Sequence, residues 1–479
     1  MIEQLVPIER LVPHEYRRWR PLVRDAIAFV FGHLSEARLS PKLAEQMALP
    51  PKTRTETRLG RMIAKMPGIQ KVGQVLARNR HLAPSVRKEL SKLENGISDV
   101  RPAEICASIR EQLGPRLKEH QVEVDTAILS EASVSAVVRF TWWNPERAQR
   151  ERGVFKVLKP YIPEFFAEDM TLLQQLGQFL TAKERGYSFA VRDIGEVLDE
   201  VRLLLEHELD FTREQETLLE AARAYRFTFG IRVPRLIKPL CTPGITAMTE
   251  ENGVKVTDAF RDSPAQRARI AEQLIEGLIS VPLFSRLENV VFHADPHAGN
   301  LLYDEARREL VILDWALAQP LARGLRRNLA MLVLMMGLRN ETAACEALQA
   351  LSERDGRRDP AQVRVIVRSV EKFFKEIPAN RLPTSLEVMR LLDRMALQGV
   401  RFPAPLAMFR KVVFTLDGVL YDVAGPGFRM DSVIARDYAT RWLGSFGAFL
   451  SPLSIRDWIA INTSALKYGA RLLTRAAFG

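Results

Sequence analysis

The chain has 479 residues, of which 47% are hydrophobic and 27% are charged, an ordinary globular composition that excludes a disordered, collagen-like or fibrous protein. Lys and Arg total 69 against 58 Asp and Glu, which gives a net charge of +11. A basic surface favours acidic partners such as nucleotides, nucleic acid or anionic lipid headgroups, but it does not choose among them.

Residues 1–120 are predicted to form a helical extension. The polar segment 47–60 contains two prolines and is typical of a linker. Residues 60–120 then show helical periodicity. In this stretch Asp99 or a neighbour suits the cap of a helix whose first turn contains Pro102.

Strand character begins after this extension. Residues 121–160 are rich in β-branched and aromatic side chains and predict a strand pair joined by a polar hairpin. Residues 164–228 are helical in pattern, and 232–250 resume strand character. Beyond residue 258 the chain is mostly helical, except for 290–320, where short apolar runs flank a loop rich in His, Asp, Gly and Asn.

This order of elements predicts an α+β fold with two lobes. The helical extension at 1–120 precedes a small α+β lobe at 121–257 and a larger, mostly helical lobe at 258–479. Two lobes with a ligand between them are a common way to build a pocket.

The cysteines and the apolar segments indicate the compartment. Cys106, Cys241 and Cys345 are far apart, so neither a disulfide framework nor a Cys-ligated zinc site is expected, and a reducing compartment is favoured. The chain does not begin with the apolar stretch of a secretory signal. The run 329–338 is about half of the ~20 residues that a spanning helix needs. We therefore expect a buried helix there and a cytoplasmic protein, with any membrane contact peripheral and at the inner face.

A cluster of polar side chains in 293–314 is the most informative feature. Its members are His293, Asp295, His297, Asn300 and Asp314. Phosphoryl transfer from a nucleotide needs a carboxylate that orients the nucleophile or accepts its proton, and oxygen ligands that hold Mg²⁺ against the phosphates. Asp295 suits the first role, and Asn300 and Asp314 suit the second. A short hairpin between them would bring Asn300 back beside Asp314.

Two other interpretations of the cluster stay open. The side chains could instead cap turns and satisfy backbone groups. Alternatively, His293, His297 and Asp295 could ligate zinc, although Pro296 sits awkwardly for such a grip and no HExxH helix supports it.

A lysine in an apolar strand adds a second signal. Lys156 lies within V-F-K-V-L, and strand alternation directs it away from the face of Phe155 and Val157. Kinases use such a strand lysine on the α- and β-phosphates, although a solvent-exposed lysine is the simpler interpretation. Upstream, small side chains dominate 130–138 and would let backbone N–H groups approach phosphates, but the run has no glycine.

The helical pattern at 196–227 carries acidic residues. Glu208 and Asp210 cannot share one face of a regular helix, whereas Asp210 and Glu214 can. A solvated acidic face is the alternative to a functional role.

Taken in order, these motifs resemble the UbiB/AarF family of atypical protein-kinase-like proteins over roughly residues 55–425. The matching pieces are K-V-G-Q at Lys71–Gln74, Lys156 in VFKVLKP, ELDFTRE at Glu208–Glu214, and HADPHAGN with D-W-A from Asp314. They resemble the family's KxGQ signature, its nucleotide-binding lysine, its ExD motif, and its catalytic loop with the equivalent of DFG.

The resemblance implies a protein-kinase-like fold with ATP and Mg²⁺ as cofactors. Lys156 would contact the phosphates, with Glu214 as its helix glutamate and Glu208 as the alternate. The nucleotide would also contact the small-residue turn that replaces the family's Ala-rich loop, which consists of Ala132, Ser133, Val134 and Ser135.

The resemblance also implies that the KxGQ segment folds over the active site. Lys71 and Gln74 would then approach the nucleotide site and the pair Glu208 and Asp210. Such an arrangement would block a bulky protein substrate, so the family is associated with ATPase or lipid-coupled activity and with the synthesis of ubiquinone or related quinones.

The chain departs from the family pattern in places. Ser135 and Ala136 replace a Gly and a Gln of the Ala-rich loop, Ala298 replaces the second Pro of HADPHPGN, and DFG is D-W-A. The metal-binding residues remain, so an active site is expected.

Three functions compete. The first is an ATP- and Mg²⁺-dependent atypical kinase or ATPase that supports lipid-linked biosynthesis. The second is a weakly catalytic accessory protein that binds lipid under nucleotide control. The third, an aminoglycoside-phosphotransferase-like enzyme, leaves the KVGQ and ELDFTRE motifs unexplained. An anionic membrane surface, an isoprenoid lipid and a second copy of the chain are candidate partners, and nucleic acid is not expected because no reading module is recognised.

Overall fold

The computed structural model describes residues 8, 12, 14–78, 99–183, 187, 192–285, 287–352, 359–378, 381–443 and 453–478. The chain divides into two compact units. Unit 1 comprises Met1–Thr212 and Ile237–Glu250, and unit 2 comprises Arg213–Leu236 and Glu251–Gly479. These units cut the chain differently from the three predicted segments, because the helical extension and the strands that follow it form one compact body. The predicted boundaries stay a prediction.

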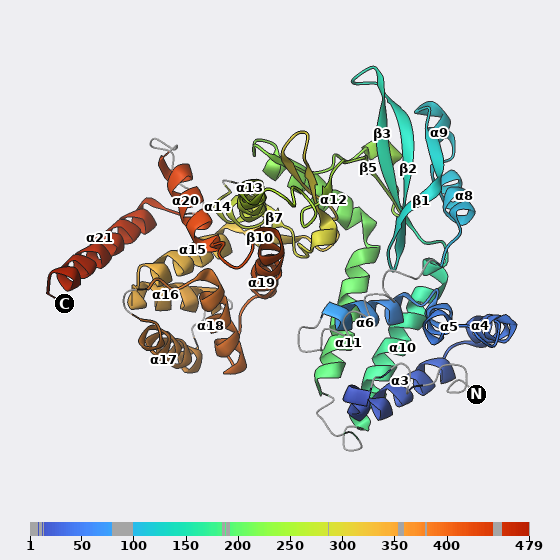
Figure 1. Cartoon of the computed structure of the whole chain (residues 1–479), viewed down its shortest axis with the longest axis horizontal. Helices are drawn as coiled ribbons and strands as arrows, with labels where there is room; N and C mark the ends of the chain where they lie inside the picture. Colours follow the sequence, from blue (N-terminus) through green and yellow to red (C-terminus); the bar gives the residue numbers. More distant parts are fainter. Residues whose placement is uncertain are drawn as a thin grey trace. The chain divides into compact units, whose positions relative to one another are not determined.

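The helices of unit 1 gather around α10, which contacts α3, α6 and α11 (Figure 1). Leu172, Leu173, Leu176 and Leu180 recur at helical spacing along α10 and are all buried. The bounds of these helices are α3 Arg20–Gly32, α4 Glu36–Ala48, α5 Thr55–Ile63, α6 Pro67–Arg78, α10 Ile162–Ala182 and α11 Arg192–Leu209.

A four-stranded antiparallel sheet belongs to the same unit and has the order β1-β2-β3-β5. Figure 1 shows its long strands beside the short helices α8 and α9. The bounds are β1 Glu123–Glu131, β2 Ser135–Asn144, β3 Gln149–Leu158, β5 Ile245–Thr249, α8 Pro102–Leu113 and α9 Pro115–Glu119. Strand character at 121–160 is therefore confirmed.

The prediction of a single strand before the hairpin is wrong, because small residues turn the chain at 132–134. The N–H of Ala132 donates to the carbonyl of Ser135 at 2.8 Å, and this bond closes the turn between β1 and β2. The small side chains that raised the possibility of a phosphate-binding turn are thus the reason for the reversal.

Close packing of β2 on β3 requires a glycine. Gly153 lies opposite Phe140 in the register, and Phe140 stacks on Phe155 with ring centroids 3.8 Å apart. A Cβ at Gly153 would lie 2.5 Å from the Phe140 ring. Along β3, Phe155 and Val157 are buried and Lys156 between them is half-buried, as strand alternation predicts.

Unit 2 is mostly helical and contains two small sheets. One has the order β4-β9-β8-β6, and the other pairs β7 with β10. The strand bounds are β4 Ile231–Arg232, β6 Val254–Lys255, β7 Asn289–Phe292, β8 Leu301–Asp304, β9 Glu309–Ile312 and β10 Gln319–Ala322. The β8–β9 hairpin and the β7–β10 pair flank the predicted polar loop.

Helices make up the rest of this unit. The predicted buried helix at 329–338 is confirmed, because Leu329, Leu332, Met335 and Met336 of α15 are buried. Among the described residues, no helix combines the length and apolarity needed to cross a membrane. The helix bounds are α12 Phe211–Tyr225, α13 Pro264–Ile275, α14 Val281–Phe284, α15 Arg323–Gly337, α16 Glu341–Ser352, α17 Pro360–Glu376, α18 Ser385–Leu397, α19 Ala404–Ala424, α20 Met430–Leu443 and α21 Ile455–Phe478.

Candidate active site

The polar loop after β7 ties Asp295 to Asn300. The N–H of His297 donates to the carbonyl of Asp295 at 2.8 Å, and the N–H of Asn300 donates to the carbonyl of His297 at 2.9 Å. The side-chain amide of Asn300 donates to the Asp295 carbonyl at 3.2 Å. This bond uses the nitrogen of the amide, so the oxygen is the atom that a metal ion would contact.

The predicted hairpin is confirmed. Leu301 of β8 pairs with Ile312 of β9, and the N–H of Leu313 donates to the carbonyl of Asn300 at 2.8 Å. The hairpin therefore returns Asp314 to the side of Asn300. Asparagine and aspartate oxygens are ligands that suit Mg²⁺, so the donor set fits that ion.

Asp314 has a backbone conformation that is uncommon for a residue with a Cβ. Its φ is +53°, in the left-handed region. Asp314 is exposed, and its carboxylate accepts the N–H of Ala316 at 3.2 Å. The carboxylate is therefore presented at the surface of unit 2 by a defined local turn.

Trp315 is buried directly after this carboxylate. Its indole N–H donates to the carbonyl of Ile312 at 3.1 Å, and the Thr217 hydroxyl donates to the Trp315 carbonyl at 3.0 Å. The ring lies at 5.7 Å from Tyr225 and edge-on at 5.2 Å from His293. The D-W-A segment is thus fixed by hydrogen bonds and by packing.

His293 has a structural role, as one of the alternatives proposed. It is 1% exposed, and its Nε2 lies 2.8 Å from the carbonyl of Leu313, so Nε2 carries the proton and donates. In the described part of the chain, no group of three His, Cys, Asp or Glu side chains is placed to hold a metal ion. The zinc interpretation therefore has no geometric support.

His297 contacts the carboxylate of the proposed base. Its Nδ1 accepts the N–H of Gly299 at 3.0 Å, and its Nε2 lies 3.6 Å from Oδ2 of Asp295. A Cβ at Gly299 would lie 2.8 Å from the ring, so the glycine makes room for it. The sequence indicated His297 as a candidate zinc ligand, and the contact with Asp295 was not predicted. The one available signal was that the two residues are two positions apart.

Lys156 belongs to unit 1, on β3 between Val137 of β2 and Thr246 of β5. Its Nζ lies 5.7 Å from the centre of the Phe211 ring, within range of a cation–π contact. Lys156 is half-buried on the face opposite Phe155, which places its stem on the sheet and its charge at the edge of the apolar layer.

Lys71 of α6 forms an ion pair with Glu208 at the end of α11. The other oxygen of Glu208 accepts a hydrogen bond from the Ser133 hydroxyl at 3.2 Å. Lys71 and Ser133 are buried, so the pair is largely shielded from water. The structure thus contains the Lys71–Glu208 contact that the resemblance implies, and the Ser133 contact is an addition that the sequence did not reveal.

Asp210 and Glu214 are the remaining acidic candidates. Asp210 is exposed at the break between α11 and α12. Glu214 is buried on α12 in unit 2, whereas Lys156 is in unit 1. The pairing of Glu214 with Lys156 therefore stays a prediction, and the side chain of Gln74 lies outside the described residues.

A profile of the ABC1 atypical kinase-like domain matches residues 92–348, more than half of the chain. The chain belongs to the ABC1 atypical kinase-like family. The UbiB-type resemblance and the expected two-lobed, kinase-like α+β fold class are thereby confirmed. The match covers the strand lysine, the ExD motif and the polar loop, and it begins after the KxGQ segment.

Proteins with related sequences agree with this assignment. The chain is 25% identical over 377 residues to "Protein ACTIVITY OF BC1 COMPLEX KINASE 7, chloroplastic" of Arabidopsis thaliana, covering 77% of this chain and 52% of that protein. It is 29% identical over 238 residues to "Probable protein kinase UbiB" of Azotobacter vinelandii, covering 48% and 42%. The chain thus spans about half the length of these relatives.

One solved structure also shows a likeness. It is the complex of Rv3197 and erythromycin from Mycobacterium tuberculosis, with a TM-score of 0.47 and 19% identity, covering 81% of this chain and 95% of that chain.

The structure shows the surroundings of two residues that depart from the ABC1 family pattern. Ser135, which replaces a glycine, is buried at the start of β2, directly after the turn whose Ser133 holds Glu208. Trp315, which replaces the Phe of DFG, gains a hydrogen bond that phenylalanine cannot make. The change at Trp315 adds a hydrogen bond within unit 2, and the carboxylate and amide at positions 314 and 300 are retained.

Proposed function

We propose that this ABC1-family chain is an ATP- and Mg²⁺-dependent atypical kinase or ATPase. The observation that carries the proposal is the β8–β9 hairpin, which returns Asp314 to Asn300 beside the loop of Asp295. Phosphoryl transfer needs oxygen ligands for Mg²⁺ close to a residue that can act as the base. In this proposal Lys156 of β3 would be the cation for the phosphates, as the family resemblance implies.

Each residue has a defined role in this proposal. Asn300 and Asp314 would hold the metal ion, which supplies neutralising charge to the phosphates when bound. Asp295 would orient the attacking hydroxyl or water, with His297 beside its carboxylate. The β1–β2 turn at 132–135 would cover the phosphates, as the Gly-rich loop does in kinases.

The client reaction is part of the proposal. The occupation of Glu208 by Lys71 supports a small or lipid-linked acceptor, or water, over a protein substrate, because a folded KxGQ helix already occupies the acidic motif. We place the activity in isoprenoid quinone or related lipid biosynthesis, at the inner face of a membrane. A nucleotide-switched, lipid-binding accessory role is the second candidate, supported by the net charge of +11.

The test compares metal-dependent turnover with binding. Asp314→Asn should reduce turnover by roughly 100-fold or more, because the metal ion that stabilises the transition state loses a charged ligand. The exposed Asp262→Asn in the same unit should leave turnover unchanged. Equal turnover of Asp314→Asn and wild type, or the lack of any thermal shift with millimolar Mg-ATP, would refute the proposal.

Liposome flotation separates the two candidates. Under the accessory role, flotation on anionic vesicles survives Asp314→Asn and fails after charge reversal of Arg17, Arg18 and Arg20. Under the enzymatic role, Asp314→Asn loses turnover whether or not it floats with the vesicles.

A further inference from the structure

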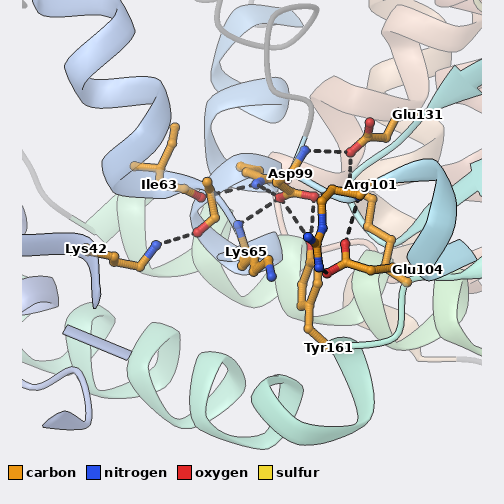
Figure 2. A network of polar contacts seen from close by, with 11 residues as sticks. Lys42, Ile63, Lys65, Asp99, Arg101, Glu104, Glu131 and Tyr161 are labelled. Atoms are coloured by element: carbon orange, nitrogen blue, oxygen red, sulfur yellow. Dashed lines mark hydrogen bonds and ion pairs between the residues drawn. The ribbon is translucent and has the colours of Figure 1, made fainter. Parts of the chain in front are cut away.

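Asp99 is the centre of a buried polar network in unit 1, drawn in Figure 2. Its carboxylate accepts the N–H of Lys65 at 2.8 Å, the side-chain amide of Gln70 at 2.9 Å, the ammonium of Lys159 at 2.7 Å and the hydroxyl of Tyr161 at 3.1 Å. The side chain of Asp99 is 1% exposed. A carboxylate surrounded in this way has a nearly fixed position.

Two of these donors, Gln70 and Lys159, lie in or directly after the elements that carry Lys71 and Lys156. Gln70 directly precedes Lys71 on α6. Lys159 follows the end of β3, three residues beyond Lys156. Asp99 therefore links Gln70, the neighbour of Lys71, with Lys159, three residues after Lys156, through one carboxyl group.

Charge makes this link strong. Lys159 is fully buried and also pairs with Glu131 of β1 at 2.9 Å. Burial alone would raise the pKa of Asp99, but the charge and the hydrogen bond of Lys159, together with those of Gln70 and Lys65, hold the pKa of Asp99 below its usual value. Removing one partner of such a buried pair leaves an uncompensated charge, which is strongly unfavourable.

A second set of contacts holds the turn before α6. The guanidinium of Arg38 donates to the carbonyl of Lys65 at 2.8 Å, and the ammonium of Lys42 donates to the carbonyl of Ala64. Figure 2 shows Lys42 reaching this turn from the side opposite Tyr161. The start of α6 is thus held by side chains of α4, by Asp99, and by Asp169 of α10, whose carboxylate accepts the N–H of Gly68 at 3.0 Å.

The far end of this chain of contacts is the Lys71–Glu208 pair. Lys71 lies one residue after Gln70, so the direction of α6 at Gln70 determines where the Lys71 ammonium is placed. Glu208 is also held by Ser133, on its other oxygen. The placement of Lys71 therefore depends on what fixes α6.

We propose that Asp99 is a positioning residue. By binding Gln70 and Lys159, it fixes α6 against the end of β3 and so places the Lys71 ammonium beside Glu208. The effect of Asp99 on nucleotide binding acts through Lys71. The proposal rests on the proposed nucleotide-binding function. It extends the site to a residue that precedes α8.

A double-mutant cycle on the full chain tests this inference. The variants are Lys71→Met, Asp99→Asn and their combination, and the measurement is the dissociation constant of Mg-ATP, titrated well below the melting temperature. We expect Lys71→Met to change the dissociation constant by about threefold or more in the wild-type background and by less than about twofold in the Asp99→Asn background.

Asp457 of unit 2 provides the matched control. Its buried carboxylate forms an ion pair with Arg327 and accepts hydrogen bonds from the N–H and the hydroxyl of Ser454. Asp457→Asn removes a comparable buried charge without touching α6. In that background the effect of Lys71→Met should keep its wild-type size.

Hydrogen exchange supplies a readout that needs no nucleotide. Asp99→Asn should accelerate exchange of the α6 amides, and Asp457→Asn should not. If Lys71→Met and Asp99→Asn act additively on the dissociation constant, or if α6 exchange is unchanged in Asp99→Asn, the inference is overturned. If wild type binds no Mg-ATP while α6 responds to Asp99→Asn, the proposed function fails and the positioning of α6 stands.

Discussion

Lys71 and Glu208 are 137 residues apart in the chain and form an ion pair within unit 1. Their side chains are 8% and 17% exposed. A cation from the KxGQ helix thus neutralises the first acid of the ExD motif.

Loss of this cation should destabilise unit 1. Lys71→Met leaves Glu208 with the Ser133 hydroxyl as its described partner, and the free energy of unfolding should fall by about 1–3 kcal/mol. Urea denaturation measures the change. Lys71→Met combined with Glu208→Gln should recover part of the loss, because no charge is then left unpaired, and a double variant less stable than Lys71→Met would contradict this account.

A methyl group at Gly299 should displace His297. The added Cβ would lie 2.8 Å from the imidazole, so the ring must leave its position beside Asp295. Gly299→Ala should lower turnover by roughly tenfold or more while the melting temperature changes little, since displacing a residue that positions the proposed base affects rate before stability. Gly324→Ala is the control, because its Cβ would meet nothing within 4 Å. Unchanged turnover in Gly299→Ala would show that the His297 contact is dispensable.

Stability should rise with pH through the titration of Lys42. Burial, with a smaller contribution from Arg38, lowers the pKa of Lys42 from 10.5 to about 8. Between these values the unfolded chain binds a proton that the folded chain has lost, so the free energy of unfolding increases with pH across this window. Chemical denaturation from pH 7.5 to 10.5 should show this increase for wild type relative to Lys42→Met.

Lys52→Met, at an exposed lysine, is the control. The free energy of unfolding of this variant should still increase with pH as it does in wild type. Parallel pH curves for wild type and Lys42→Met would mean that the Lys42 ammonium is better solvated than its burial indicates.

Gly153→Ala should be the more damaging of two glycine substitutions in unit 1. The new Cβ would lie 2.5 Å from the Phe140 ring, which is itself stacked on Phe155. Overpacking of this kind lowers stability by about 1–3 kcal/mol. Gly60→Ala meets nothing within 4 Å in the helix α5 and should be neutral or stabilising by about 0.5–1 kcal/mol. The reverse order of melting temperatures would contradict the packing described for β2 and β3.

The parts of the site that could be predicted are the local ones. The HADPHAGN loop and its hairpin follow from turn residues and strand alternation within about twenty positions, and the structure places Asn300 beside Asp314 as expected. Strand alternation likewise fixed the face of Lys156.

The contacts that escaped prediction join distant segments. The prediction that Asp99 or a neighbour caps the helix with Pro102 is confirmed for the neighbour Arg101, whereas the contact of Asp99 with Lys159, 60 residues away, was not predicted. Ser133 and Glu208 are 75 residues apart. No local pattern encodes such pairs, because burial of both partners depends on how separate elements pack.

The indole of Trp315 has a consequence for motion around Asp314. An aromatic ring without a polar atom could rotate out of its pocket at the loss of packing alone, whereas this ring would also have to give up its hydrogen bond to Ile312. Outward rotation would separate it from Tyr225 and His293 as well. Any movement of the Asp314 carboxylate that carries Trp315 with it therefore has to break this hydrogen bond as well as the ring contacts.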